Sequence, residues 1–253
     1  MAVNIRNLFF VIFSVGMILF IPMSSIAEEI RVAVASNFKN TMLSIARKFE
    51  KNSDHNVVFS FGSTGKHYAQ IKNGAPFDAF FAADVHRPEL LEQEGVSLPG
   101  SRFTYAIGKV ILWSPKTNFI NSNADVLQKG KFRYLALANP RLAPYGKAAK
   151  EVLQGLKLWQ DLNQKIVRGE NISQTYQFVK TGNADLGFVA YSQVKRPNLK
   201  SEGSYWVVPQ SRYTPIEQQA IALKDNVSTR MFMSFVRSEQ ALKIIHDFGY
   251  DTP

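Results

Sequence analysis

The chain has 253 residues, of which 45% are hydrophobic and 20% are charged. This composition is typical of a globular protein with a sizeable core and excludes a disordered chain. The 30 Lys and Arg residues outnumber the 20 Asp and Glu residues, but their spread along the chain argues against a nucleic-acid-binding segment. A net charge of +10 would still raise the local concentration of small anions. The lack of cysteine excludes disulfides, zinc–thiolate sites and a lipid-carrying cysteine.

Residues 1–27 have the layout of a secretory signal peptide. Arg6 precedes an apolar run from Leu8 to Phe20, and the small residues Ser25 and Ala27 follow that run. A retained membrane anchor is the alternative interpretation of this segment. The small-x-small spacing favours cleavage after Ala27, which predicts a soluble periplasmic protein.

Apolar strand patterns alternate with amphipathic helix patterns along the rest of the chain. Taken in chain order, the predicted strands are 31–36, 57–63, 77–83, 106–114, 134–140 and 185–192. The predicted helices are 38–49, 64–72, 87–94, 144–159, 171–184 and 228–250. This alternation predicts an α/β fold of parallel sheets with helices on both faces.

Four of the helices begin at polar or flexible residues just after a strand or loop. These starts are Ser36-Asn37, Ser63-Thr64, Tyr145-Gly146 and Ile172-Ser173. In an open α/β sheet, ligands bind in the crevice outside the carboxyl ends of the strands, where helix N-termini offer unpaired N–H groups that suit anions. The alternative is ordinary N-capping, in which Ser and Asn side chains bind only the N–H groups of their own helix.

Several segments resemble one family. The run from "VAVASNFKN" to "FDAFFAADV", residues 32–85, is similar to the first lobe of the periplasmic molybdate-binding proteins of ABC transporters. The segments "ALANPRLAPYGKAAKEVL", "NISQTYQFV" and "ADLGFVAYSQV" resemble the second lobe of that family in the same order. The sharpest part of the match runs from Gln70 to Asp84.

The resemblance implies a two-lobed receptor of the type II periplasmic-binding-protein fold. Lobe 1 is expected to hold 28–106 and 215–253 and lobe 2 to hold 107–214, with crossings near 106–109 and 212–215. The family captures molybdate or tungstate, which brings molybdenum as an oxyanion, and delivers it to an inner-membrane ABC permease with a cytoplasmic ATPase. By the same likeness we expect a monomer with no cofactor, no enzymatic activity and no nucleic-acid partner.

The family's ligand positions can be placed in this sequence one by one. They fall on Ser36 and Asn37 (first position), Ser63 (second), Tyr145 (third) and Ile172 (fourth, through its backbone N–H). Tyr191 falls near a tyrosine that some members use, although "GFVAYS" has one more residue between Gly and Tyr than their pattern. Lys66 and His67 follow the second position and are further candidates for contact with the anion.

The chemistry of these residues fits a fully ionised anion. Neutral donors occupy all of the family's ligand positions, whereas a phosphate site needs an acceptor for the proton of the partly protonated ligand. Molybdate, tungstate and sulfate need donors only, so a binding protein for sulfate remains an alternative. An exported hydrolase with Ser36 or Ser63 as nucleophile and His67 as base is a second alternative. The chain lacks a G-x-S-x-G motif, and His67 lies only four residues after Ser63.

Overall fold

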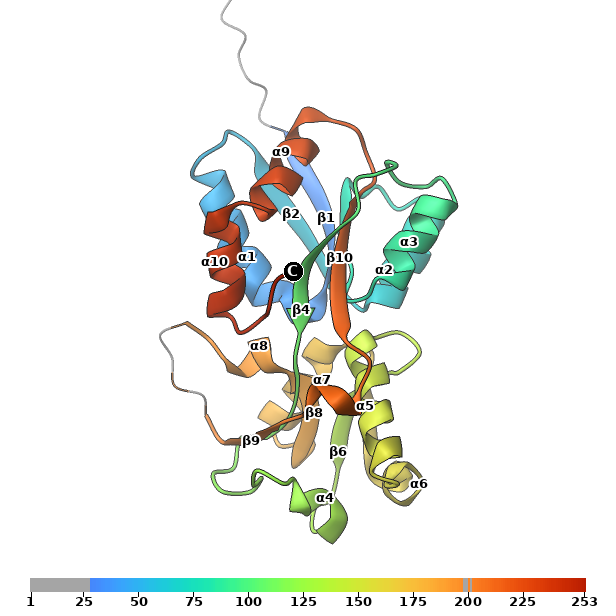
Figure 1. The fold of residues 1–253 in the computed structure, drawn as a ribbon, viewed down its shortest axis with the longest axis vertical. Helices are drawn as coiled ribbons and strands as arrows, with labels where there is room; N and C mark the ends of the chain where they lie inside the picture. Colours follow the sequence, from blue (N-terminus) through green and yellow to red (C-terminus); the bar gives the residue numbers. More distant parts are fainter. Residues whose placement is uncertain (1–27, 198–199, 201) are drawn as a thin grey trace, which may run out of the picture.

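The structure, a computed structural model, describes residues 28–197, 200 and 202–253. It consists of two lobes that lie end to end, each a five-stranded sheet covered by helices (Figure 1). The two-lobed α/β fold predicted from the sequence is therefore confirmed. The predicted signal peptide, residues 1–27, lies outside the described residues. In the part of the chain that is described, no helix is long and apolar enough to cross a membrane.

The first lobe is built on a sheet with the strand order β2-β1-β3-β10-β4. Its strands are β1 (Glu29–Ala35), β2 (Asn56–Gly62), β3 (Ala79–Phe81), β4 (Phe103–Gly108) and β10 (Ile216–Ala222). Its helices are η1 (Ser36–Phe38), α1 (Lys39–Glu50), α2 (Thr64–Lys72), α3 (His86–Gln93), α9 (Val227–Val236) and α10 (Glu239–Asp247). Helices α1, α9 and α10 lie on one side of the sheet, and α2 and α3 lie on the other (Figure 1).

The second lobe repeats this plan with the strand order β7-β6-β8-β5-β9. Its strands are β5 (Val110–Ser114), β6 (Leu135–Ala138), β7 (Ile166–Gly169), β8 (Leu186–Ala190) and β9 (Ser204–Val207). Its helices are α4 (Asp125–Lys129), α5 (Pro144–Gly155), α6 (Trp159–Leu162), η2 (Asn163–Lys165), α7 (Ile172–Lys180), α8 (Tyr191–Val194) and η3 (Gln210–Arg212).

The sheets are mixed, so the prediction of purely parallel sheets is wrong. Strand β1 pairs in parallel with β2 and β3, and β6 pairs in parallel with β7 and β8, as the alternating pattern predicts. Strand β10 runs antiparallel to β3 and β4, and β5 runs antiparallel to β8 and β9. These antiparallel strands are the ones next to the crossings, where the chain enters a lobe from the other lobe instead of from a helix of the same lobe.

Two predicted elements are each divided into two. The single strand predicted over 106–114 is β4 and β5, which belong to different sheets and are separated by Lys109. The single C-terminal helix predicted over 228–250 is α9 and α10, because Ser238 starts a new helix by accepting a hydrogen bond from the N–H of Ala241. Helix α2 is confirmed at its predicted limits, 64–72.

The two interlobe crossings lie side by side. The chain leaves the first sheet after Gly108 and returns to it at Ile216, and these two residues are paired in the ladder between β4 and β10. Two adjacent strands that join two lobes form a hinge about which the lobes can rotate. The limits predicted for the two lobes, 28–106 with 215–253 and 107–214, stay a prediction. In the structure, β4 of the first sheet continues two residues past 106, to Gly108.

Close packing fixes the N-terminal end of α5 against β6. A Cβ atom at position 146 would lie 2.1 Å from the carbonyl oxygen of Ala138 and 2.7 Å from its carbonyl carbon. Both are backbone atoms, so they cannot move aside without shifting the strand. Gly146 therefore allows this helix end to approach the carboxyl end of β6, where the second lobe faces the first.

We expect Gly146→Ala to lower the free energy of unfolding by about 1–3 kcal/mol, because the added methyl group overpacks this contact. Gly155→Ala is the matched control on the same helix, since a Cβ atom there has no neighbour within 4 Å. It should leave stability unchanged or raise it by up to about 1 kcal/mol through lower backbone entropy in the unfolded chain. Denaturant unfolding of both variants measures the difference, and equal stabilities would contradict the packing argument.

Candidate anion-binding site

A small cavity lies where the two lobes meet. Its volume is about 10 Å³, roughly the space that one water molecule needs and far below the roughly 300–1,000 Å³ of pockets that take drug-sized ligands. It is lined by Ala35, Ser36, Asn37, Gly62, Ser63, Thr64, Ala83, Ala143, Pro144, Tyr145 and Ile172. Five of the six residues predicted to bind the ligand are therefore brought together, although they come from two lobes.

The cavity lies at the carboxyl ends of four strands. Strands β1 and β2 end directly before Ser36 and Ser63, and β6 and β7 lead into the helices that begin at Pro144 and Ile172. Within the described residues, the backbone N–H groups of Tyr145 and Ile172 make no hydrogen bond. Such unpaired donors at helix N-termini carry partial positive charge, so they are suited to bind an anion.

The surroundings of Ser63 favour a ligand-binding role over a capping role. It occupies the N-cap position of α2, yet its side chain makes no capping hydrogen bond. Its Oγ is buried and has no partner among the described residues. A buried hydroxyl without a partner is unfavourable, and most such groups in proteins are satisfied. The hydroxyl is therefore available to donate to a ligand.

Ser36 contributes to the cavity and also joins the lobes. Its Oγ donates to Oδ1 of Asn171 over 3.2 Å, and its carbonyl oxygen accepts from Oγ of Ser173 over 3.0 Å. Asn171 also caps α7 by accepting from the N–H groups of Ser173 and Gln174. This cap does not use the N–H of Ile172, a residue that lines the cavity.

The side chain of Asn37 is directed toward the hinge. Its Nδ2 donates to Oε1 of Gln218 over 2.7 Å and to the hydroxyl oxygen of Tyr250 over 3.0 Å. The prediction that Asn37 lies at the cavity agrees with its place in the lining, but its amide is already paired. Only the backbone N–H of Asn37 remains for a ligand.

Tyr250 connects the two lobes beneath the cavity. Its hydroxyl donates to the carbonyl oxygen of Asn37 over 2.9 Å and accepts from Oγ of Ser192, in the second lobe, over 2.7 Å. Burial raises the pKa of Tyr250 to about 12, so the phenol stays neutral at physiological pH. These contacts link the first and second lobes through one buried side chain.

Tyr145 lies beside this network without a hydrogen bond of its own. Its hydroxyl is buried and unpartnered among the described residues, and a Cβ atom at Gly108 would lie only 2.1 Å from it. Burial, together with the nearby Tyr250 hydroxyl, raises the pKa of Tyr145 well above its ordinary value. A neutral phenol next to the cavity is a second hydroxyl donor with no protein acceptor.

Tyr191, the sixth predicted residue, is not brought to the cavity. It begins α8, and its ring lies 6.0 Å from that of Tyr205, away from the lining residues. The extra residue in "GFVAYS" gives the physical reason, because it moves the tyrosine along the chain beyond the end of β8. The structure thus places Tyr191, one of the predicted ligand residues, outside the cavity lining.

Lys66 and Asp84 are both occupied by other partners. Nζ of Lys66 lies 2.7 Å from Oε1 of Glu170 in the other lobe, so it forms an interlobe ion pair at the surface. Asp84 pairs with Arg87 and accepts from its backbone N–H, and Arg87 donates to the carbonyl oxygen of Arg141 across the lobes. In the described part of the chain, no charged side chain lines the cavity.

Neutral donors alone define the chemistry of the cavity. A dianion can be buried without a countercharge when oriented dipoles and hydroxyls bind its oxygens. A ligand that carries a proton would need an acceptor, and no carboxylate lines the cavity among the described residues. The sequence did not reveal Gln218, Ser192 and Tyr250, because they approach Asn37 only through the fold and belong to no local motif.

Two lobes that meet over a small cavity of neutral donors define a binding protein that closes around a small anion. Residues 30–251 match the family described as bacterial extracellular solute-binding protein, and the chain belongs to this family. The match covers both lobes and the hinge between them.

Relatives with high identity carry more specific names. The chain is 48% identical over 227 residues to molybdate-binding protein ModA of Azotobacter vinelandii, covering 88% of this chain and 90% of that protein. It is 41% identical over 242 residues to molybdate-binding protein ModA of Rhodobacter capsulatus, covering 94% of each. The solved periplasmic molybdate-binding protein of Azotobacter vinelandii superposes with a TM-score of 0.86 at 42% identity, covering 88% of this chain and 99% of that one.

His67 lies behind the cavity as a buried neutral group. Its Nδ1 is 3.1 Å from Oε1 of Gln70, and a Cβ atom at Gly62 would lie 2.9 Å from its Nε2. Burial lowers the pKa of His67 below its ordinary value of 6.5. The side chain therefore supports the turn after β2 and does not supply a charge to the cavity.

We expect the free energy of unfolding to decrease as the pH falls below about 6.5, because the unfolded chain then binds a proton at position 67 that the folded chain does not yet bind. The decrease should level off once the folded imidazole is also protonated. His67→Gln should remove this part of the pH dependence. Denaturant unfolding of both proteins between about pH 8 and pH 5 measures it, and parallel curves would contradict a lowered pKa.

Proposed function

We propose that the protein is the periplasmic binding component of an ABC transporter that captures molybdate or tungstate between its lobes. The observation that carries this proposal is the pair of buried, unpartnered hydroxyls of Ser63 and Tyr145 next to free helix N–H groups, with no charged side chain in the lining. The names of the relatives that cover nearly the whole chain support it.

The donor set accounts for tight binding of a dianion. Hydrogen bonds to a charged group contribute about 1.5–3 kcal/mol each. The proposed donors are the unpartnered hydroxyls of Ser63 and Tyr145 and backbone N–H groups that include those of Asn37 and Ile172. The Ser36 hydroxyl would join them by giving up its bond to Asn171. Several such bonds exceed the cost of association and of closing the lobes.

Sulfate is the second candidate, because it is also a fully ionised tetrahedral dianion. It would use the same donors, and only the fit of the anion to the cavity would separate it from molybdate. A serine hydrolase is not favoured. Among the described residues no base is hydrogen-bonded to Ser63, and Nδ1 of His67 is paired with Gln70.

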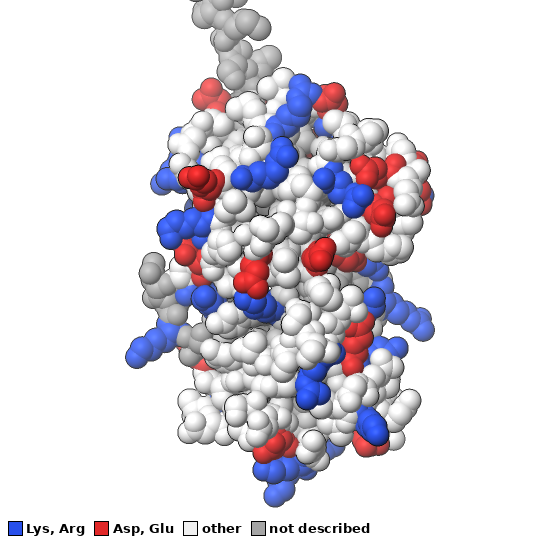
Figure 2. Space-filling model, in the orientation of Figure 1, with Lys and Arg blue, Asp and Glu red and all other residues white. Residues whose placement is uncertain are grey.

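The resemblance to the molybdate-binding family also supports a proposal for the partners and the compartment. The ligand would be delivered to an inner-membrane permease with its ATPase, and the protein would act as a monomer in the periplasm without a cofactor. Figure 2 shows Lys and Arg interspersed with Asp and Glu on the face that it draws. A nucleic-acid-binding surface would gather the basic residues, and the basic residues are also spread along the sequence, so we propose no nucleic-acid partner.

A thermal-shift panel tests the ligand class. Molybdate and tungstate should stabilise the mature protein at micromolar concentration, and phosphate should not, because the site offers no acceptor for its proton. A ligand at 100 times its Kd adds about 2.7 kcal/mol of stability. A phosphate response equal to that of molybdate would refute the donor-only site, and a response to sulfate alone would select the second candidate.

Ser63→Ala should weaken molybdate binding about tenfold to 150-fold, the equivalent of one charge-assisted hydrogen bond. Because the hydroxyl has no partner in the protein, the ligand-free variant should be as stable as the wild type. Ser97→Ala is the matched control: its Oγ is also buried without a partner among the described residues, but Ser97 does not line the cavity. Calorimetric titration of molybdate into the wild type and both variants measures the affinities. Equal losses of affinity in Ser63→Ala and Ser97→Ala would exclude a direct role for Ser63.

A further inference from the structure

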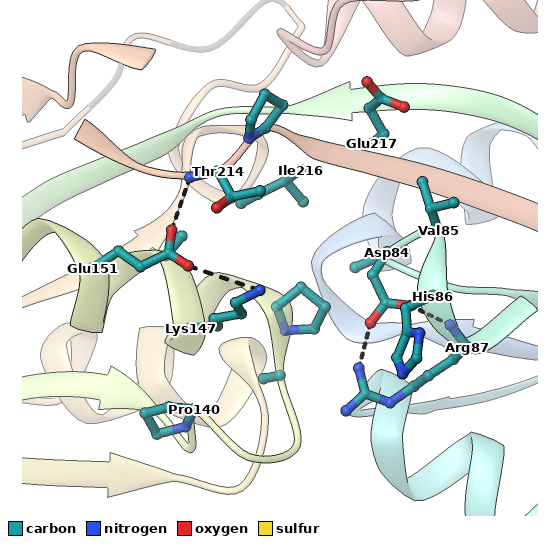
Figure 3. A pocket seen from close by; sticks show the side chains of 15 residues that line it. Asp84, Val85, His86, Arg87, Pro140, Lys147, Glu151, Thr214, Ile216 and Glu217 are labelled. Atoms are coloured by element: carbon teal, nitrogen blue, oxygen red, sulfur yellow. Dashed lines mark hydrogen bonds and ion pairs between the residues drawn. The ribbon is translucent and has the colours of Figure 1, made fainter. Parts of the chain in front are cut away.

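Two grooves flank the cavity at the junction of the lobes. The first, here called the basic groove, consists of two adjoining pockets that share Tyr176, Gln193 and Arg196. The inner pocket, which also contains Ser36, Asn37 and Lys39, adjoins the cavity, and the outer pocket contains Trp113, Lys180, Lys200 and Glu202. The second, here called the hinge groove, lies between α3, α5 and the start of β10 (Figure 3). Both grooves share lining residues with the cavity, so each is a possible route to it.

The grooves differ in charge. The basic groove is lined by four cationic residues (Lys39, Lys180, Arg196 and Lys200) and one acidic residue, Glu202. The hinge groove is lined by two cationic residues, Arg87 and Lys147, and three acidic ones, Asp84, Glu151 and Glu217. A dianion is attracted to the first groove and is not attracted to the second.

Ion pairing increases this difference. In the part of the chain that the structure describes, none of the cations of the basic groove forms an ion pair with a carboxylate. In the hinge groove, Arg87 pairs with Asp84, and Lys147 lies 3.8 Å from Glu151, as Figure 3 shows. The cations of the hinge groove are thus largely neutralised by their neighbours.

The walls between the grooves and the cavity also differ. The basic groove shares Ser36 and Asn37 with the cavity. The Ser36 hydroxyl donates to Asn171, and the Ser36 carbonyl oxygen accepts from the Ser173 hydroxyl, so these two bonds close the boundary there. An anion that displaces them can exchange its water for the two serine hydroxyls. The hinge groove shares only Ala83, Ala143 and Pro144 with the cavity. These side chains offer no hydrogen bond to a desolvating anion.

We propose that the basic groove is a weak binding site for divalent oxyanions and the route by which they reach the cavity. The inference rests on the proposed function and adds a second, exposed site to it. Lys39 belongs to the first lobe and Arg196 to the second, so the site attracts anions to the mouth formed between both lobes. Binding there is electrostatic, which makes it sensitive to salt, whereas binding in the closed cavity depends on short hydrogen bonds.

The test measures molybdate association by stopped-flow fluorescence. Trp113 stacks on Tyr176 in the groove with ring centroids 5.0 Å apart, which gives a native reporter. Arg196→Gln and Lys39→Gln should each slow association about threefold to fourfold at low ionic strength, the effect of one charge on a dianion about 10 Å away in water. Dissociation should be unchanged, and the difference should disappear at about 1 M salt.

Lys147→Gln is the matched control, because it removes one charge beside the same cavity but in the hinge groove. Its association rate should fall less than that of Arg196→Gln, because an anion that enters through the basic groove does not pass Lys147. An equal slowing in Lys147→Gln and Arg196→Gln, or no slowing in either groove variant, would overturn the proposed route while equilibrium binding of molybdate stayed intact. Failure of the wild type to bind molybdate at equilibrium would instead overturn the proposed function. The same variants titrated with sulfate or tungstate would then decide whether the groove guides any divalent oxyanion.

Discussion

The proposed function imposes one requirement on the structure, the removal of a doubly charged anion from water without a countercharge. Each oxygen of such a ligand needs hydrogen bonds from fixed dipoles. In this protein the donors are divided between the lobes: the Ser63 hydroxyl belongs to the first lobe, and the N–H groups of Tyr145 and Ile172 belong to the second. Neither lobe alone would satisfy the anion, so under the proposed function binding and closure of the lobes would be one event energetically.

The buried polar network at the hinge gives this coupling a structural basis. Asn37 presents its backbone to the cavity and its side-chain amide to Gln218 and Tyr250, and Tyr250 in turn bonds to Ser192 of the other lobe. The bond between Tyr250 and Ser192 thus joins the two lobes next to Asn37, a residue of the cavity wall. Hydrogen-bonded buried groups restrict one another's movement, so the network favours one arrangement of the lobes over many, although Nε2 of Gln218 has no partner among the described residues.

The sequence predicted the fold class and five residues that line the cavity, and it could do so for a local reason. Strand patterns and polar helix starts are adjacent in the chain, and parallel strands bring such starts to one edge of the sheet. The antiparallel strands, the break at Lys109 and the contact of Asn37 with Tyr250 depend on how distant segments meet, so no local pattern contains them. Tyr191 shows the same limit: its neighbourhood resembles a binding segment, but the extra residue places it outside the lining.

Serine and asparagine at helix starts have two possible roles, and here the structure separates them. Asn171 caps α7 through its side chain, which satisfies the N–H groups of Ser173 and Gln174 and leaves that of Ile172 for the cavity. Ser63 occupies the equivalent position of α2 and makes no cap, so its hydroxyl remains available. The second lobe therefore offers the backbone N–H of Ile172 at the capped start of α7. The first lobe offers the side-chain hydroxyl of Ser63 at the uncapped start of α2. An anion held between them would satisfy both helix ends at once, which is why the proposed binding site lies where the lobes meet.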